Sequence, residues 1–251
     1  MTGASSRRTG RRGPLCRIRR TTFYRVSKDT RCDELPRRGR SEQAGPRDRG
    51  APTRPEVASV LDLAPTARAV ADVVAGVRDD QLHDPTPCDD MTVAALLDHL
   101  HGLAWAFRVA AQKSPEAAGT APSADAAHLV ADWRTAIPAR LTALAQAWSE
   151  PAAWEGFTAA GGLDLPADVA GVIALDELVL HGWDLAVATG HPFVPDDDAV
   201  AAVLEFTTAM SAPGQEASRE GLFGPVVPVA EDAPAFHRAL GNSGRDPRRG
   251  R

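Results

Sequence analysis

The chain has 251 residues, 43% of them hydrophobic, which is enough to bury a sizeable core in one main domain. Its charge is unevenly spread: residues 1–56 hold 16 Lys and Arg against 6 Asp and Glu, whereas the remainder holds 12 against 27. The acidic remainder would repel nucleic acid and anionic lipid, so neither is an expected partner.

The cysteine count and the hydropathy indicate in which cellular compartment the protein is expected. Cys16 and Cys32 lie in the basic segment and only Cys88 lies in the remainder, so no disulfide framework or Cys-based zinc site can form within the main domain. The chain also lacks the roughly 18 to 20 consecutive apolar residues of a membrane span, and its basic segment lacks a signal-peptide core. We therefore expect a cytoplasmic protein that is neither exported nor inserted in a membrane.

Residues 1–56 are rich in Arg, Gly, Ser and Pro and have no apolar periodicity. Such a composition does not bury enough surface to offset chain entropy, and it predicts a disordered extension. Two alternatives remain: a basic arm for nucleic acid or targeting, and a gene whose translation begins near Val57.

From Val57 onward, Ala-, Leu- and Val-rich blocks with helical spacing alternate with Pro and Gly. The first helix is expected over Ala58–Val77, with its regular part starting near Ala64 because Pro65 favours a first turn. A second helix should start after Thr92, a suitable N-cap, and reach Gln112. The third is expected over residues 124–148, with a kink or break at Pro138.

Residues 151–166 contain the turn signal AAGG and are expected to form a loop or a short hairpin. A fourth helix follows over Ala167–Thr189, and a fifth, capped by one of the acids at 196–198, extends to Met210. The tail, residues 213–251, is Pro-rich and is expected to lie extended across the bundle. Because no strand-helix alternation occurs, we expect a mainly α fold: a helical bundle over residues 57–212, with an additional C-terminal helix and an extended tail.

The fourth predicted helix carries the first candidate site residues. Glu177 and His181 are four residues apart, so both side chains rise from one helix face and can grip one ion. An isolated pair of this kind is also typical of a surface contact. The apolar neighbours favour the metal, since a Glu and a His in such a helix need partners; they are Ile173, Leu175, Leu178, Val179, Leu180, Trp183 and Leu185.

His99 is the third candidate, because it lies in the apolar stripe of the second predicted helix. A hydrogen-bonded core histidine is the alternative. With Glu177 and His181 it would form a His₂Glu set inside a bundle, the donor set of a catalytic zinc site with open positions. Asp184 follows His181 by three residues and either orients that imidazole or makes a surface contact.

Three other residues with reactive or ligating side chains lie near these motifs. Cys88 precedes the helix that carries His99, so it either approaches the site or is a small buried turn residue. His101 and His191 lie off the proposed ligand face or in a loop, and we assign them no role.

Three pieces of the chain together resemble a known family: VRDDQLHDPTPCDDMTVAALLDHL, ALDELVLHGWDLAVATG and GLFGPVVPVAEDAP. The stretch Val57–Pro247 is similar to the metal-binding domain of the mycothiol-dependent maleylpyruvate isomerases, part of the DinB-like group of four-helix bundles. The resemblance implies a divalent metal, usually zinc, held by His99, Glu177 and His181. Only about forty residues follow the fifth predicted helix, where the isomerase has a second domain, so its substrate specificity is not carried over.

The resemblance implies a thiol-dependent transferase or isomerase, in which a small thiol such as mycothiol binds the metal and attacks a small electrophile. The alternative from another class is a metal-binding module without catalysis, such as a sensor or storage protein. A nitrogen and carboxylate site also suits Ni²⁺, Fe²⁺ or Mn²⁺.

Overall fold

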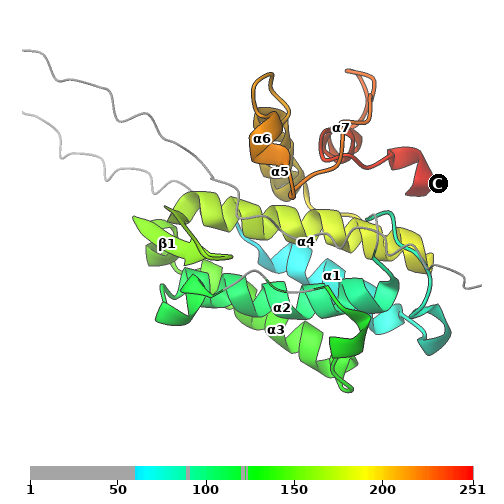
Figure 1. Cartoon of the computed structure of the whole chain (residues 1–251), viewed down its shortest axis with the longest axis horizontal. Coiled ribbons are helices and arrows are strands. Elements are labelled where there is room, and N and C mark those ends of the chain that lie inside the picture. The colour runs from blue at the N-terminus through cyan, green and yellow to red at the C-terminus, as the bar shows by residue number, and fades with distance from the viewer. Residues whose placement is uncertain (1–59, 89–90, 120–121, 123, 251) are drawn as a thin grey trace, which may run out of the picture.

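The computed structural model describes residues 60–88, 91–119, 122 and 124–250. The predicted extension over residues 1–56 and the boundary at Val57 lie outside the described residues. The fold is mainly helical, as the sequence predicts, and its centre is a four-helix bundle (Figure 1), made of α1 (Ala64–Gly76), α2 (Val93–Ala111), α3 (Trp133–Trp148) and α4 (Ala167–Thr189).

The helices pack in a ring in which α1 and α2 each contact both α3 and α4. Their facing sides form one core of fully buried side chains, among them Leu96, Leu97, Leu100, Ile137, Leu141, Leu144, Leu175 and Leu178. Trp133, Trp148 and Trp183, which lie on or beside the predicted apolar stripes, are 4%, 0% and 6% exposed. None of the described helices is long and apolar enough to cross a membrane.

Local signals set the ends of two helices where the sequence predicts them. The Thr92 hydroxyl accepts a hydrogen bond from the Ala95 amide at 3.3 Å, which caps α2. Helix α5 (Asp197–Met210) is capped in the same way, since Asp196 accepts from the Ala199 amide at 2.9 Å.

The third helix is shorter than predicted. A single 3-10 turn, η3 (Ala126–His128), precedes α3, which begins only at Trp133. Between them Leu129 has a non-helical backbone and packs against the core from an irregular segment. Its apolar side chain therefore fits the helical spacing of the sequence although it is not in a helix. Pro138 lies inside α3 and does not end it.

For residues 151–166 the sequence predicts a loop or a short hairpin, and the structure shows the hairpin. A 3-10 turn, η4 (Pro151–Trp154), leads into the antiparallel strands β1 (Phe157–Ala160) and β2 (Leu163–Pro166). The Thr158 hydroxyl donates to the Ala110 carbonyl at 2.6 Å, which ties the hairpin to the end of α2.

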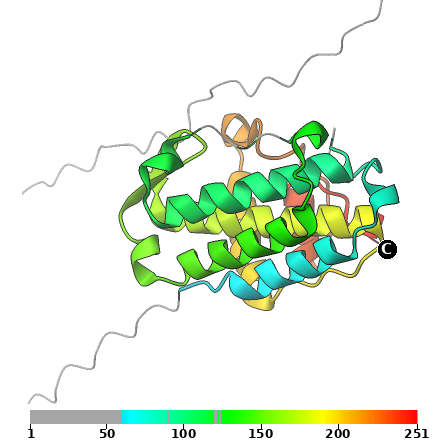
Figure 2. The same cartoon turned by 90° about the horizontal axis from the view of Figure 1, so that it is seen from below.

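The tail is not wholly extended, contrary to expectation. It contains the short helices α6 (Glu216–Arg219) and α7 (Ala235–Asn242) and a 3-10 turn, η5 (Pro247–Gly250). Leu240 of α7 packs with Leu180 and Trp183 of α4 in a second apolar cluster. Helices α5 to α7 cover the side of α4 that faces away from the bundle (Figures 1 and 2), so α4 is enclosed from both sides.

Candidate metal centre

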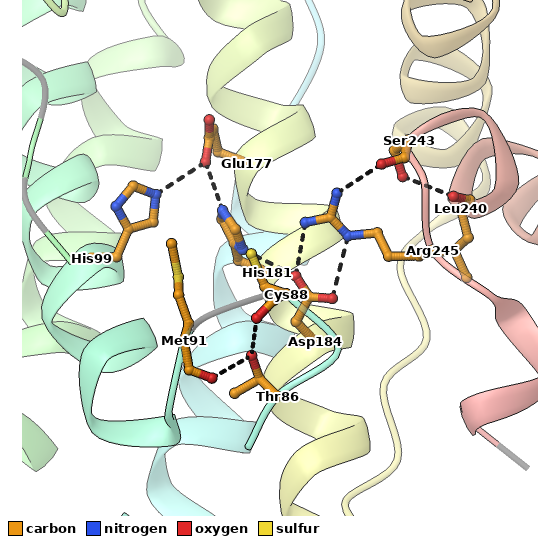
Figure 3. A network of polar contacts seen from close by, with 10 residues as sticks. All are labelled: Thr86, Cys88, Met91, His99, Glu177, His181, Asp184, Leu240, Ser243 and Arg245. Atoms are coloured by element: carbon orange, nitrogen blue, oxygen red, sulfur yellow. Dashed lines mark hydrogen bonds and ion pairs between the residues drawn. The ribbon is translucent and has the colours of Figure 1, made fainter. Parts of the chain in front are cut away.

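The bundle brings the three candidate ligands together. His99 lies on α2, and Glu177 and His181 lie one turn apart on α4, in neighbouring helices. Glu177 Oε2 lies 3.4 Å from His99 Nε2 and 3.0 Å from His181 Nε2 (Figure 3). The side chains are 17%, 23% and 9% exposed, in the order His99, Glu177, His181.

The spacing of these donor atoms suits a divalent ion. One donor atom from each residue lies within 4.8 Å of the others. In a tetrahedral zinc site with bonds of about 2.0–2.2 Å, neighbouring donors are about 3.3–3.6 Å apart. The 3.4 Å from Glu177 Oε2 to His99 Nε2 falls in that range, and the 3.0 Å to His181 Nε2 is slightly shorter. Two imidazole nitrogens and one carboxylate oxygen are also a donor set that zinc accepts.

Asp184 lies behind His181, as one of its two predicted roles requires. Its Oδ2 is 3.1 Å from His181 Nδ1, and its side chain is fully buried. This contact leaves Nε2 of the same ring turned towards Glu177. Carboxylates commonly fix the tautomer and the orientation of a metal-binding histidine in this way.

Arg245, a residue that sequence reasoning missed, completes this chain of contacts. Its Nη2 donates to Asp184 Oδ2 at 2.8 Å and its Nε to Asp184 Oδ1 at 3.3 Å. The Arg245 side chain is 8% exposed. The pair joins residues 61 positions apart, and nothing in the local sequence of either points to the other.

Charges and hydrogen bonds shift the pKa values in the site. Burial alone would lower the pKa of His181, but its hydrogen bonds to Asp184 and Glu177 and their charges raise that pKa to about 9. Burial would raise the pKa of Glu177, yet hydrogen bonds from His181 and His99 hold it far below its usual range. Without a metal, His181 is therefore protonated at neutral pH and lies between two carboxylates.

The neighbouring acids differ in charge. Burial, with the negative charge of Glu177, raises the pKa of Asp176 well above its usual value and so favours its neutral form. Burial acts in the same direction on Asp184, but the charges and hydrogen bonds of Arg245 and His181 together outweigh it and lower the pKa of Asp184. Asp184 therefore stays ionised although no water reaches it.

A second group of donors shares one residue with the first. Cys88, His181 and Asp184 also offer atoms within 4.8 Å of one another. Both oxygens of Asp184 already accept from Arg245, whose positive charge opposes a cation at that position. The group that contains His99 is therefore the better candidate.

The histidines that were given no role lie apart from both groups. His101 accepts a hydrogen bond from Arg140 through its carbonyl, and His191 pairs with the Thr189 hydroxyl. A surface pocket of about 660 Å³ between the ends of α2 and α3 contains none of the candidate ligands.

Comparison with known proteins matches part of the chain to a family. Residues 63–186 match the model described as the mycothiol maleylpyruvate isomerase N-terminal domain. This stretch includes His99, Glu177, His181 and Asp184 and ends before Arg245. Two uncharacterized proteins, from two strains of Mycobacterium tuberculosis, are each 29% identical over 180 residues, which cover 66% of this chain and 82% of the relative. No solved structure matches the chain. Through residues 63–186, the chain belongs to the mycothiol maleylpyruvate isomerase N-terminal domain family.

Proposed function

We propose that the chain binds a divalent metal ion through His99, Glu177 and His181 and acts as a thiol-dependent transferase or isomerase on a small electrophile. Zinc is the candidate metal and mycothiol the candidate thiol. The observation that carries the proposal is the convergence of two imidazole Nε2 atoms, from α2 and α4, on one oxygen of Glu177. The family match supports the assignment of the thiol.

Three protein donors leave a position for an external ligand, as in catalytic zinc sites. When bound there, a divalent ion would lower the pKa of a coordinated thiol and so supply a nucleophilic thiolate at neutral pH. Glu177 would provide an anionic oxygen donor, and the ring of His181 would be held by its bond to Asp184.

The charges of the surrounding side chains favour an anionic thiol. Without a metal, Glu177 and Asp184 are negative, and protonated His181 and Arg245 are positive, so the four charges cancel. When a divalent ion takes the place of the His181 proton, the sum becomes +1. One thiolate would restore neutrality in a site that is largely buried.

Cobalt substitution tests both parts of the proposal. The full chain is loaded with Co²⁺, and near-ultraviolet and visible spectra are recorded during titration with mycothiol and, as the control, with S-methylated mycothiol. A sulfur-to-cobalt charge-transfer band that appears only with the free thiol supports the proposed function. Stoichiometric Co²⁺ binding without this band identifies the non-catalytic metal-binding module instead, and the absence of Co²⁺ binding refutes both.

A further inference from the structure

We infer that Arg245 is a positioning residue for this site: by gripping Asp184, it fixes the imidazole of His181 with Nε2 turned towards Glu177. The inference rests on the proposed function for the identity of the bound ion, but the contacts themselves do not depend on it. It also assigns a role to the C-terminal tail, which lies outside the matched family domain.

The first argument is the geometry of the grip. Arg245 contacts both oxygens of Asp184, at 2.8 and 3.3 Å, so that carboxylate cannot rotate freely. The oxygen that accepts at 2.8 Å is also the one 3.1 Å from His181 Nδ1. Any rotation of Asp184 would therefore break the contact that orients the ring.

The second argument is the cost of burial. Asp184 is fully buried and Arg245 is 8% exposed, and removing two charges from water costs several kcal/mol per ion unless each is well paired. Burial of the pair is therefore weak evidence for a gain in stability. The ionised carboxylate of Asp184 also contacts His181 Nδ1 and so holds that ring nitrogen at a fixed position.

The third argument is that the backbone around Arg245 holds its side chain in one orientation. Gly244 has a φ of +89°, and a Cβ there would lie 2.8 Å from backbone atoms of Gly224, so only glycine fits this close approach. After this turn, the Arg245 amide donates to the Leu240 carbonyl at 2.8 Å. Its Nη1 donates to the Ser243 carbonyl at 3.2 Å. The guanidinium is thus hydrogen-bonded both to the end of α7 and to Asp184 (Figure 3).

A purely structural role, in which Arg245 only docks the tail, is the competing explanation. Arg219 provides a matched control, because it also ties the tail together. Its Nη1 donates to the Ser211 hydroxyl at 2.9 Å and its Nη2 to the Gly224 carbonyl at 2.6 Å. Neither contact involves Asp184 or a candidate ligand. Loss of Arg219 should therefore weaken the tail without disturbing His181.

The first measurement is Zn²⁺ affinity of the folded full-length protein, determined by competition with a chromophoric chelator. Loss of the contact that orients a metal ligand typically costs about 10–100-fold in metal affinity. Arg245→Met also removes a positive charge near the ion, which partly offsets this loss, so the variant should bind Zn²⁺ about 10-fold more weakly than wild type. Arg219→Met should bind within roughly twofold of wild type, since the Arg219 side chain contacts neither Asp184 nor a candidate ligand. Wild-type affinity in Arg245→Met would overturn the inference.

The second measurement asks whether Arg245 acts through Asp184. In an Asp184→Asn background, adding Arg245→Met should change Zn²⁺ affinity by no more than about twofold, because residues that act as one unit are not additive. If Arg245→Met lowers Zn²⁺ affinity as much in the Asp184→Asn background as in wild type, Arg245 does not act through Asp184. If Arg245→Met does not fold, Arg245→Lys replaces it, with an expected loss of roughly threefold or more because an ammonium lacks the planar fork. Unchanged affinity in that variant counts against the inference.

A readout without metal separates this inference from the proposed function. In the metal-free protein the hydrogen-bonded Nδ1 proton of His181 should give a downfield NMR signal in wild type and Arg219→Met, and the signal should be lost in Arg245→Met. If wild type binds no Zn²⁺, the proposed function fails while this signal still tests the grip of Arg245 on the ring. Persistence of the signal in Arg245→Met would overturn the positioning role.

Discussion

Glu177 Oε2 and His99 Nε2 lie 3.4 Å apart although 78 residues separate them in the chain. One residue belongs to α4 and the other to α2, so the donor set exists only when these helices are packed together. An ion bound there would favour the folded bundle over the unfolded chain, by about 4 kcal/mol at a thousandfold excess over Kd. Metal binding and bundle stability should therefore be measured together.

We expect His99→Ala and His181→Ala to abolish stoichiometric Zn²⁺ binding. Glu177→Gln should weaken it, because the amide keeps an oxygen donor but loses the negative charge. Isothermal titration of the full chain with Zn²⁺ measures both stoichiometry and affinity.

His101→Ala is the matched control for these ligand variants. It removes a half-buried imidazole from the same helix, α2, and leaves in place the His101 backbone carbonyl, which accepts a hydrogen bond from Arg140. It should titrate like wild type. Wild-type stoichiometry and affinity in His99→Ala would remove α2 from the site.

Zinc binding at pH 7 should release about one proton from His181, because that imidazole has a pKa of about 9 without the metal and must be neutral to act as a ligand. Apparent affinity should then rise about tenfold per pH unit as pH approaches 9. Titrations in two buffers of different ionisation enthalpy count the protons released. An observed enthalpy that is the same in both buffers would argue that His181 is not the ligand.

The metal-free protein should lose stability as pH rises from about 6.5 to 9. The folded pKa of His181 lies above its ordinary value of 6.5, so its contribution is complete below 6.5 and disappears as pH passes through about 9. A shift of this size corresponds to a loss on the order of 3 kcal/mol. Urea unfolding in EDTA at several pH values measures it.

The control for this pH dependence is His181→Gln, which removes the titrating group. The lowered pKa values of Glu177 and Asp184 affect stability only at acidic pH, and the raised pKa of Asp176 acts in both proteins, so the variant should lose less stability than wild type between pH 6.5 and 9. Equal pH dependence in the two proteins would mean that another group is responsible.

Leu240→Ala should lower the free energy of unfolding by about 2–5 kcal/mol, since Leu240 is fully buried between α7 and α4. It should also shift tryptophan emission to longer wavelength, because Trp183 loses cover. Leu222→Ala, at a tail residue that is 36% exposed, should change stability by no more than about 0.5 kcal/mol. Similar losses in both variants would contradict the packing of α7 on α4.

Local sequence signals predict the fold well where they are strong. Helix α4 has the predicted bounds because its apolar run is long and Gly190 follows it, and α2 and α5 begin after the predicted caps. The candidate ligands could be selected because Glu177 and His181 have helical spacing and because His99 lies in an apolar stripe. A role for Asp184 beside His181 could also be predicted, because three residues separate the two on one helix.

The missing parts depend on contacts between distant residues. Helix α7 has eight residues, which are too few to form a stable helix alone. Phe236, Ala239 and Leu240 have helical spacing, but the Pro-rich segments on both sides favour an extended tail instead. The sequence predicts too early a start for α3 because Leu129 packs in the core from a non-helical segment. Arg245 has no signal of its own, because only tertiary packing brings it to Asp184.

The fully buried carboxylate of Asp184 has a consequence for exchanging parts between relatives. It lies within the matched domain, whereas the cation that neutralises it comes from the segment beyond that domain. A chimera that joins residues 63–186 to another C-terminal region would leave an uncompensated charge inside the protein unless the new region brings its own Arg or Lys to the same place. The two regions must therefore be transplanted together, or Asp184 must be replaced by a neutral residue when they are separated.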